Sequence, residues 1–156
     1  MDEAARKVKA RMERLCARRE YCSSEILSKI KSALGEGDSS AGEILESLVA
    51  GGFVDDARYC SAFAREKSSL SAWGPVKIRY ALRMKHLPEQ LIDEGLSAID
   101  SDSAGDRLKK LLSARWKTLQ KDPQGRLKLI RYALSRGYGY DEVEAAVRTV
   151  CEASDW

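Results

Sequence analysis

Several residue types are scarce in this 156-residue chain, and each scarcity excludes a class of protein. Asparagine is absent, proline occurs three times and histidine once. Few prolines, together with abundant Leu, Ala, Lys, Arg and Glu, favour helices over sheet. The four cysteines form no CxxC pair, and with a single histidine, His86, they offer no recognisable zinc spacing. We therefore expect reduced thiols, no metal and no cofactor.

Long apolar stretches are missing as well. No run approaches the roughly 18 apolar residues of a membrane span. The opening segment, MDEAARKVKARMERL, is charged throughout and lacks the apolar core of a secretory signal. The GxSxG motif of serine hydrolases and the GxxxxGK motif of phosphate-binding loops do not occur either. The sequence therefore predicts a cytoplasmic binding or regulatory protein, not an enzyme.

A pentapeptide, IRYAL, occurs twice, and its two copies lie 52 residues apart. A further step of 52 residues towards the N-terminus leads to a similar apolar pair in EILSKI. Apolar residues at i and i+4 share one face of a helix, so we interpret these pairs as the core-facing stripe of three equivalent helices. The pairs are Ile26 and Ile30, Ile78 and Leu82, and Ile130 and Leu134.

Apolar residues at i, i+3 and i+4 recur along almost the whole chain, interrupted by short polar or glycine-bearing stretches. This pattern predicts nine helices in three triplets. One of them opens at Pro88, and the polar stretch DSDSAGD is expected to be a loop. The other eight run from about 3 to 18, 24 to 34, 41 to 50, 56 to 69, 75 to 86, 106 to 120, 123 to 136 and 141 to 151.

The third helix of each triplet also carries a matching i, i+4 pair. These pairs are Ile44 and Leu48, Ile92 and Leu96, and Val143 and Val147. A three-helix unit of roughly 50 residues buries only a small core, so neighbouring units should pack against each other. We expect an all-α fold, an elongated and curved array of three tandem three-helix repeats that are like helix-turn-helix units. The repeats are expected to cover residues 1–52, 53–102 and 103–156.

Two helix starts have recognisable signals. Asp55 can accept hydrogen bonds from the free amides of a first turn. Arg58 follows three residues later and can neutralise Asp55 and Asp56 locally. Gly74 interrupts the chain before Pro75, whose missing amide donor is not needed at the first position of a helix.

Charge is distributed in bands along the chain. Residues 36–56 and 88–106 each hold six acidic residues and no basic one. Residues 57–87 hold seven basic residues against one acidic, and residues 107–140 hold ten against one. The net charge of +3 therefore hides acidic third helices and basic first and middle helices. Such banding predicts a face of positive potential that is directed at a polyanion or at an acidic protein surface.

The basic residues of the second and third middle helices recur in kind, and we take them as candidates for partner binding. Lys and Arg on an amphipathic helix more often form a solvated face, which is the alternative for each of them. Tyr80 and Tyr132, which lie among them, could stack on nucleobases or complete the packing between helices. The candidates are Lys77, Arg79, Arg83, Lys85, Arg126, Lys128, Arg131 and Arg136.

Three functional classes fit this pattern. The chain could regulate a protein–nucleic acid assembly, bind DNA directly through helix-turn-helix-like units, or serve as a scaffold whose charge only maintains solubility. A reader of base sequence would present Arg, Asn or Gln from one recognition helix. Here the basic residues are spread over six helices and asparagine is absent, which favours recognition by shape and charge.

Four segments of the chain resemble the RecX family of bacterial regulatory proteins. They are RREYCSSEIL (18–27), FVDDARYCSAF (53–63), WGPVKIRYAL (73–82) and LIRYALSRGY (129–138). The positions that match family motifs are Asp55, Asp56, Arg58 and Tyr59, then Trp73, Gly74, Pro75 and Lys77, and finally Arg136, Gly137 and Tyr138. The chain departs from the family at Ala72 and His86, where glycines are usual, and this puts the local turn geometry in doubt.

The resemblance implies an all-helical array of three-helix repeats that binds the RecA recombinase. By this resemblance the chain would lodge in the groove of the RecA filament on single-stranded DNA. It would lower the filament's ATPase, strand-exchange and coprotease activities in DNA repair and the SOS response. The expected partners are the RecA filament and, weakly or indirectly, single-stranded DNA, with the protein acting as a monomer away from membranes. The alternative is a helical-repeat protein that acts on DNA without RecA.

Overall fold

The computed structural model describes residues 1–35 and 37–153. Over these residues the fold is all-α, as expected, with nine helices and no strand. The helices are α1 (Glu3–Arg18), α2 (Ser23–Leu34), α3 (Ser40–Ala50), α4 (Asp56–Ser69), α5 (Pro75–Met84), α6 (Glu89–Ser97), α7 (Ser101–Leu119), α8 (Gly125–Ser135) and α9 (Tyr140–Ala153).

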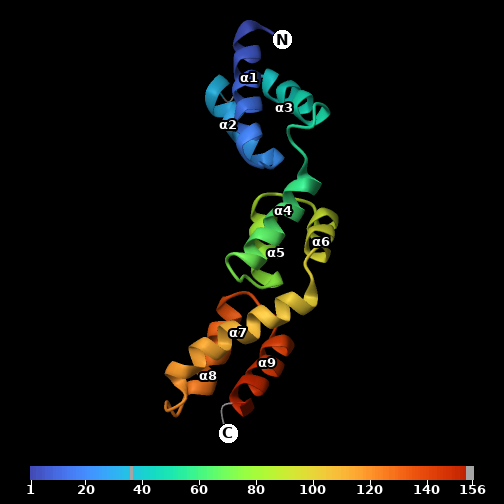
Figure 1. Cartoon of the computed structure of the whole chain (residues 1–156). Coiled ribbons are helices and arrows are strands. Elements are labelled where there is room, and N and C mark those ends of the chain that lie inside the picture. Colours follow the sequence, from blue (N-terminus) through green and yellow to red (C-terminus); the bar gives the residue numbers. More distant parts are fainter. Residues whose placement is uncertain (36, 154–156) are drawn as a thin grey trace.

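The helices form three successive three-helix units along an elongated molecule (Figure 1). The first unit contains α1 to α3, the second α4 to α6 and the third α7 to α9, and the N-terminus lies at the opposite end from the last unit. Each unit has an apolar core of its own. Cys22, the residue before α2, packs into the core of the second unit, where it is fully buried in one cluster with Tyr59 and Leu82.

Aspartates cap several of the helices at their N-termini. The carboxylate of Asp2 accepts from the amide of Ala5 at 2.8 Å, and that of Asp55 accepts from the amide of Arg58 at 3.0 Å. Asp100 caps α7, which begins at Ser101 rather than at the expected residue 106. The polar stretch that was expected to be a loop is therefore the N-terminal end of α7, and the expected boundary at 102/103 falls inside this helix.

The predicted core stripe is correct in the first two units. Ile26 and Ile30 of α2 and Ile78 and Leu82 of α5 have no solvent-accessible surface. Five of the six residues predicted for the third helices are also fully buried, namely Ile44, Leu48, Ile92, Val143 and Val147. The sixth residue, Leu96, is partly buried and packs against the core of the second unit. The i, i+4 periodicity therefore identified the inward face of these helices.

The predicted stripe is wrong in the third unit. Leu134 is 40% exposed and Ile130 is only partly buried. The buried stripe of α8 is formed by Leu129 and Ala133, both fully inaccessible to solvent. The identical pentapeptides therefore present different faces to their cores.

The physical reason is a one-residue change in spacing. The residues that cap the C-termini of α5 and α8, Lys85 and Arg136, lie 51 residues apart and not 52. Each residue advances about 100° around a helix. A shift of one residue in the pentapeptide relative to the helix end therefore turns the matching side chains from the core towards solvent. Ile78 is thus equivalent to Leu129 in space.

Candidate partner-binding surface

The middle helices α2, α5 and α8 are held in line by two similar contacts between units. At each contact, the C-terminal end of a middle helix meets the N-terminus of the middle helix in the preceding unit. We call the contact of Ser23 and Ser24 with Asp56 and Lys85 joint 1. The contact of residues 71–76 with residues 136–138 is joint 2.

Joint 1 is made mainly by side chains. The carboxylate of Asp56 accepts from the amide of Ser23 at 2.8 Å and from its hydroxyl at 2.7 Å, so it caps α2 from the neighbouring unit. The hydroxyl of Ser24 donates to the carbonyl of Lys85 at 2.6 Å. The ammonium of Lys85 lies 3.2 Å from the carboxylate of Glu25. Burial raises the pKa of Glu25, but its hydrogen bonds from the Cys22 amide and from Lys85 outweigh this and leave the pKa below its ordinary value.

The side chain of Arg58 was expected to neutralise Asp55 and Asp56. This prediction is wrong, because the guanidinium pairs with neither carboxylate. Only the backbone amide of Arg58 donates to Asp55. Its guanidinium donates to Glu20 at 2.7 Å and to the carbonyl of Gly52 at 3.0 Å. The Asp-Asp-x-Arg motif therefore connects the first two units.

Joint 2 is made by direct contact of backbones. The amide of Gly74 donates to the carbonyl of Arg136 at 2.7 Å, and the amide of Val76 donates to the carbonyl of Gly137 at 2.9 Å. A Cβ atom on Gly74 would lie 2.3 Å from the Gly137 carbonyl oxygen, and one on Gly137 would lie 2.2 Å from the Cβ of Lys77. Neither position has space for a side chain.

Two side chains reinforce joint 2. The guanidinium of Arg136 donates to the carbonyl of Ser71, and the hydroxyl of Tyr138 donates to the carbonyl of Ala72 at 3.0 Å. The Trp-Gly-Pro and Arg-Gly-Tyr motifs, which look independent in the sequence, are therefore the two halves of one contact. The available signal was a glycine at a helix terminus in each motif, because such glycines often mark a close approach of two backbones.

The two departures from family glycines lie at left-handed backbone positions. Ala72 has φ 53° and His86 has φ 63°. Gly137, which is equivalent to His86 in the third unit, has φ 93°. The turn geometry is therefore kept, although residues with a Cβ atom pay a steric cost in this conformation.

Trp73 occupies the side of joint 2 that faces α4. Its indole meets the ring of Phe63 edge to face at a centroid distance of 6.3 Å. The ammonium groups of Lys67 and Lys77 lie 4.8 Å and 4.6 Å from the indole centroid. Lys77, one of the predicted binding residues, therefore contacts this ring, an arrangement that is favourable through the ring quadrupole.

The two arginines predicted for binding on α5 are paired within their own unit. The guanidinium of Arg79 lies 2.8 Å from the carboxylate of Glu89 and 2.8 Å from that of Asp93, both on α6. Arg83 also donates to Glu89, and this hydrogen bond lowers the pKa of the carboxylate. The acidic band of α6 thus neutralises part of the basic band of α5.

The remaining candidates divide between the joints and the surface of α8. Lys85 and Arg136 form part of joints 1 and 2. Lys128 lies 2.5 Å from the carboxylate of Asp122. Arg126 and Arg131 are exposed and form no ion pair with another residue that the structure describes. The eight predicted residues therefore do not form one continuous basic patch.

Exposed apolar side chains lie beside these cations, and the charge pattern did not predict them. On α5, Val76, Tyr80 and Met84 recur every four residues and are 58%, 64% and 63% exposed. On α8, Leu127 and Leu134 are 44% and 40% exposed. We call these five residues, together with Arg131 between the two leucines, the outer face. Because α5 and α8 meet at joint 2, its two stretches follow one another along the molecule.

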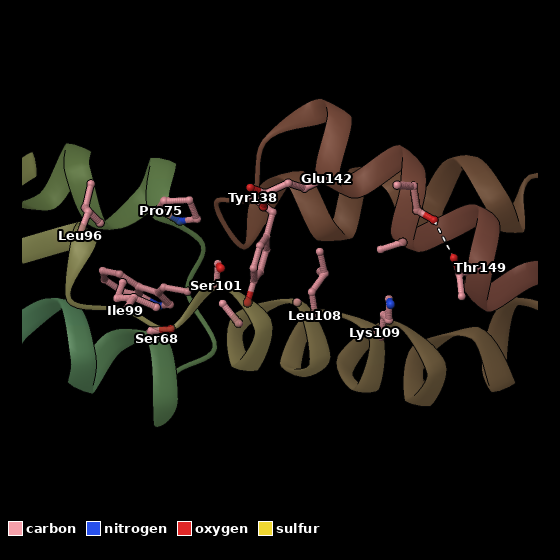
Figure 2. A pocket seen from close by; sticks show the side chains of 15 residues that line it. Ser68, Pro75, Leu96, Ile99, Ser101, Leu108, Lys109, Tyr138, Glu142 and Thr149 are labelled. Carbon is pink, nitrogen blue, oxygen red and sulfur yellow. Dashed lines mark hydrogen bonds between the residues drawn. The ribbon is translucent and has the colours of Figure 1, made fainter.

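A groove of about 440 Å³ lies between the second and third units (Figure 2). The residues that line it include Leu96 and Ile99 from the second unit and Leu108 and Tyr138 from the third. Of the residues that line it, none belongs to the eight candidates. The groove is therefore separate from the outer face.

Among residues 1–35 and 37–153, no group of three or more His, Cys, Asp or Glu side chains is placed so that it could hold a metal ion. No helix in this part of the chain combines the length and the apolar character needed to cross a bilayer.

Comparison with known sequences relates the chain to one family. Residues 55–96 match the family model described as "RecX, second three-helix domain". The chain is 31% identical over 135 residues to the regulatory protein RecX of Chromohalobacter salexigens, covering 86% of each protein. It is 29% identical over 108 residues to the regulatory protein RecX of Clostridium tetani, covering 67% of this chain but only 49% of that relative. The chain thus spans about half the length of the clostridial relative.

Comparison with solved structures identifies the same fold. The crystal structure of RecX from Lactobacillus salivarius superimposes with a TM-score of 0.86 at 16% identity, covering 96% of this chain and 98% of that one. At this identity the likeness concerns the fold, and it extends over all three units.

Proposed function

The chain belongs to the RecX family of regulatory proteins, and from this premise we propose that it binds the RecA filament on single-stranded DNA and lowers its ATPase activity. Strand exchange and coprotease activity of the filament would fall with it, which would make the protein a regulator of DNA repair and the SOS response. It would act as a cytoplasmic monomer that reaches DNA mainly through the filament.

The observation that supports this proposal most is the outer face. Exposed apolar side chains that gather on one surface often mark a site of contact with another protein. Tyr and Arg, both present on this face, are the residues most often found at the energetic centre of protein interfaces. The end-to-end middle helices present these side chains along the molecule, which suits an elongated partner such as a filament.

The candidate cations take different parts in this proposal. Arg126 and Lys128 flank Leu127 in the sequence, Arg131 lies between Leu127 and Leu134, and all three would meet acidic groups of the partner. Arg79 and Arg83 border the apolar residues of α5, where their pairing with α6 holds them in place. Lys77, Lys85 and Arg136 would act indirectly, by fixing the joints that align the helices.

Co-sedimentation with RecA filaments tests the proposal. The protein should pellet with filaments assembled on single-stranded DNA more strongly than with the same DNA alone, and DNA-dependent ATP hydrolysis should fall as it is added. If it pelleted equally with naked DNA and left ATP hydrolysis unchanged, the proposal would fail in favour of direct action on DNA.

A further inference from the structure

Helix α1 displays an exposed row of cations that the middle-helix pattern did not identify. Residues 6–19 hold seven basic residues and one acidic residue. Lys7, Arg11, Arg14 and Arg18 are all exposed, and their spacing of four, three and four residues places them on one face of the helix. We call these four residues the basic ridge. Met12, on the opposite side of the helix, is buried in the first core.

The ridge is not neutralised within the molecule. Lys7 lies 3.6 Å from Glu3, and both side chains are largely exposed, so this pair is weak. Arg11, Arg14 and Arg18 form no ion pair with any carboxylate of residues 1–35 and 37–153. The arginines of α5 differ, because α6 supplies them with carboxylates. Like charges three and four residues apart destabilise a helix, so an anionic ligand would relieve an unfavourable arrangement.

A second helix adds to the positive charge beside the ridge. A groove of about 280 Å³ separates α1 from α2, with Arg11 on one side and Lys29 on the other. Lys29 is exposed, and its ammonium lies 5.6 Å from the centroid of the Tyr21 ring. Arg19 covers the same ring at 4.2 Å. Two cations of the protein therefore lie over the Tyr21 ring, so this ring is not available to stack on a base. The groove itself presents the positive charges of Arg11 and Lys29.

We infer that the basic ridge binds the phosphate backbone of a polynucleotide without reading its bases. Guanidinium groups bind phosphate oxygens in a bidentate manner, and three of the four ridge residues are arginines. With a rise of 1.5 Å per residue, the ridge is about 16 Å long. That length matches about five phosphates of one strand, at roughly 3.4 Å per phosphate along a duplex. Phosphate contacts position a protein on nucleic acid and carry no sequence information.

This contact goes beyond the proposed function. The ridge lies in the first unit, whereas the outer face belongs to the second and third units, towards the other end of the molecule (Figure 1). DNA binding by the ridge needs no RecA. It can therefore succeed or fail independently of filament binding.

Fluorescence anisotropy with labelled DNA and no RecA tests the inference. The probes are a 25-nucleotide oligothymidine and a 25-base-pair duplex, each titrated with the full chain at several salt concentrations. The triple variant R11Q/R14Q/R18Q should weaken binding to at least one probe by about tenfold or more at low salt. Its plot of log affinity against log salt should be shallower by about 2, since each lost phosphate contact removes roughly 0.7 from the slope with single strands.

Two further variants control for folding and for net charge. R11K/R14K/R18K keeps the charge and should keep most of the salt slope. K109Q/K110Q/K117Q removes three exposed charges from α7 and should bind both probes like the wild type. Circular dichroism should be the same for all of these proteins. An unchanged slope in the glutamine variant of α1 would overturn the inference. An equal loss in the α7 variant would also overturn it, because net charge alone would then account for binding.

Discussion

At the scale of single residues, two left-handed positions hold side chains that strain the backbone. Ala72 and His86 adopt positive φ angles without being glycine, and the steric cost for such residues is about 1–2 kcal/mol. Ala72 lies in joint 2, where its carbonyl accepts from Tyr138. His86 follows the C-cap of α5. Backbone strain is therefore present in both turns that flank α5, one before the helix and one after it.

Replacing either residue with glycine should stabilise the protein. Ala72→Gly and His86→Gly remove the strain but increase the freedom of the unfolded chain, so we expect a net gain of about 0.5–1 kcal/mol each. Urea unfolding measures this. Ala114→Gly, at an exposed position inside α7, is the matched control and should lose about 1 kcal/mol. Losses of similar size at all three sites would contradict the account.

Two leucines of α8 distinguish its buried from its exposed face. Leu129→Ala should destabilise the protein by about 2–5 kcal/mol, because a fully buried side chain is lost and a cavity remains. Leu134→Ala should cost less than about 1 kcal/mol, since this side chain is 40% exposed. Equilibrium unfolding of both variants gives the comparison. Equal losses, or a larger loss at Leu134, would restore the pentapeptide register expected from the sequence.

The error in that register shows what residue-level patterns can and cannot predict. In α5 the positions that follow the buried pair Ile78 and Leu82 are Arg79 and Arg83, so no second apolar pair overlaps it. In α8, Leu129, Ile130, Ala133 and Leu134 offer two overlapping pairs, and both satisfy the rule. Only the packing of α8 against α7 and α9 decides between them, and this information is not local in the sequence.

At the scale of helices, the aspartate pair before α4 serves two different helices. Asp55 caps α4 itself, and Asp56 caps α2 of the preceding unit. Most helix bounds were predictable because caps, glycines and prolines act within a few residues, and the start of α7 is the exception. The joints were not predictable, because they connect residues 33 to 66 positions apart, and no local periodicity of the sequence indicates such contacts.

Amide hydrogen exchange can separate the two capping roles. Asp56→Ala should speed exchange at the amide of Ser23, and Asp55→Ala should speed it at the amide of Arg58, with each variant losing about 0.5–2 kcal/mol of stability. Each variant is the control for the other. If Asp56→Ala left Ser23 protected, joint 1 would not depend on this carboxylate.

At the scale of the whole molecule, the banded charge has two uses. The acidic band of α6 pairs with Arg79 and Arg83 of α5, so part of the banding is balanced by ion pairs within one unit. Arg126 and Arg131 of α8 and the arginines of the basic ridge form no ion pair with another described residue, and these are the cations that our proposals assign to partners. The charge bands led to the prediction of a positive face, but they carried no information on the exposed apolar residues that lie between the cations.

The central claim is that the outer face contacts the RecA filament, and one comparison of ATPase suppression tests it most directly. The double variant Tyr80→Glu/Met84→Glu places two charges on the outer face, and Ser28→Glu/Ser32→Glu places the same charges on exposed, equivalent positions of α2. The free energy of unfolding of both variants should lie within about 0.5 kcal/mol of the wild-type value, because the sites are exposed. The account predicts that at least about tenfold more of the α5 variant than of the wild type is needed to suppress DNA-dependent ATP hydrolysis, because the centre of the interface is lost. The α2 variant should suppress it like the wild type. A folded α5 variant with undiminished suppression would contradict the claim.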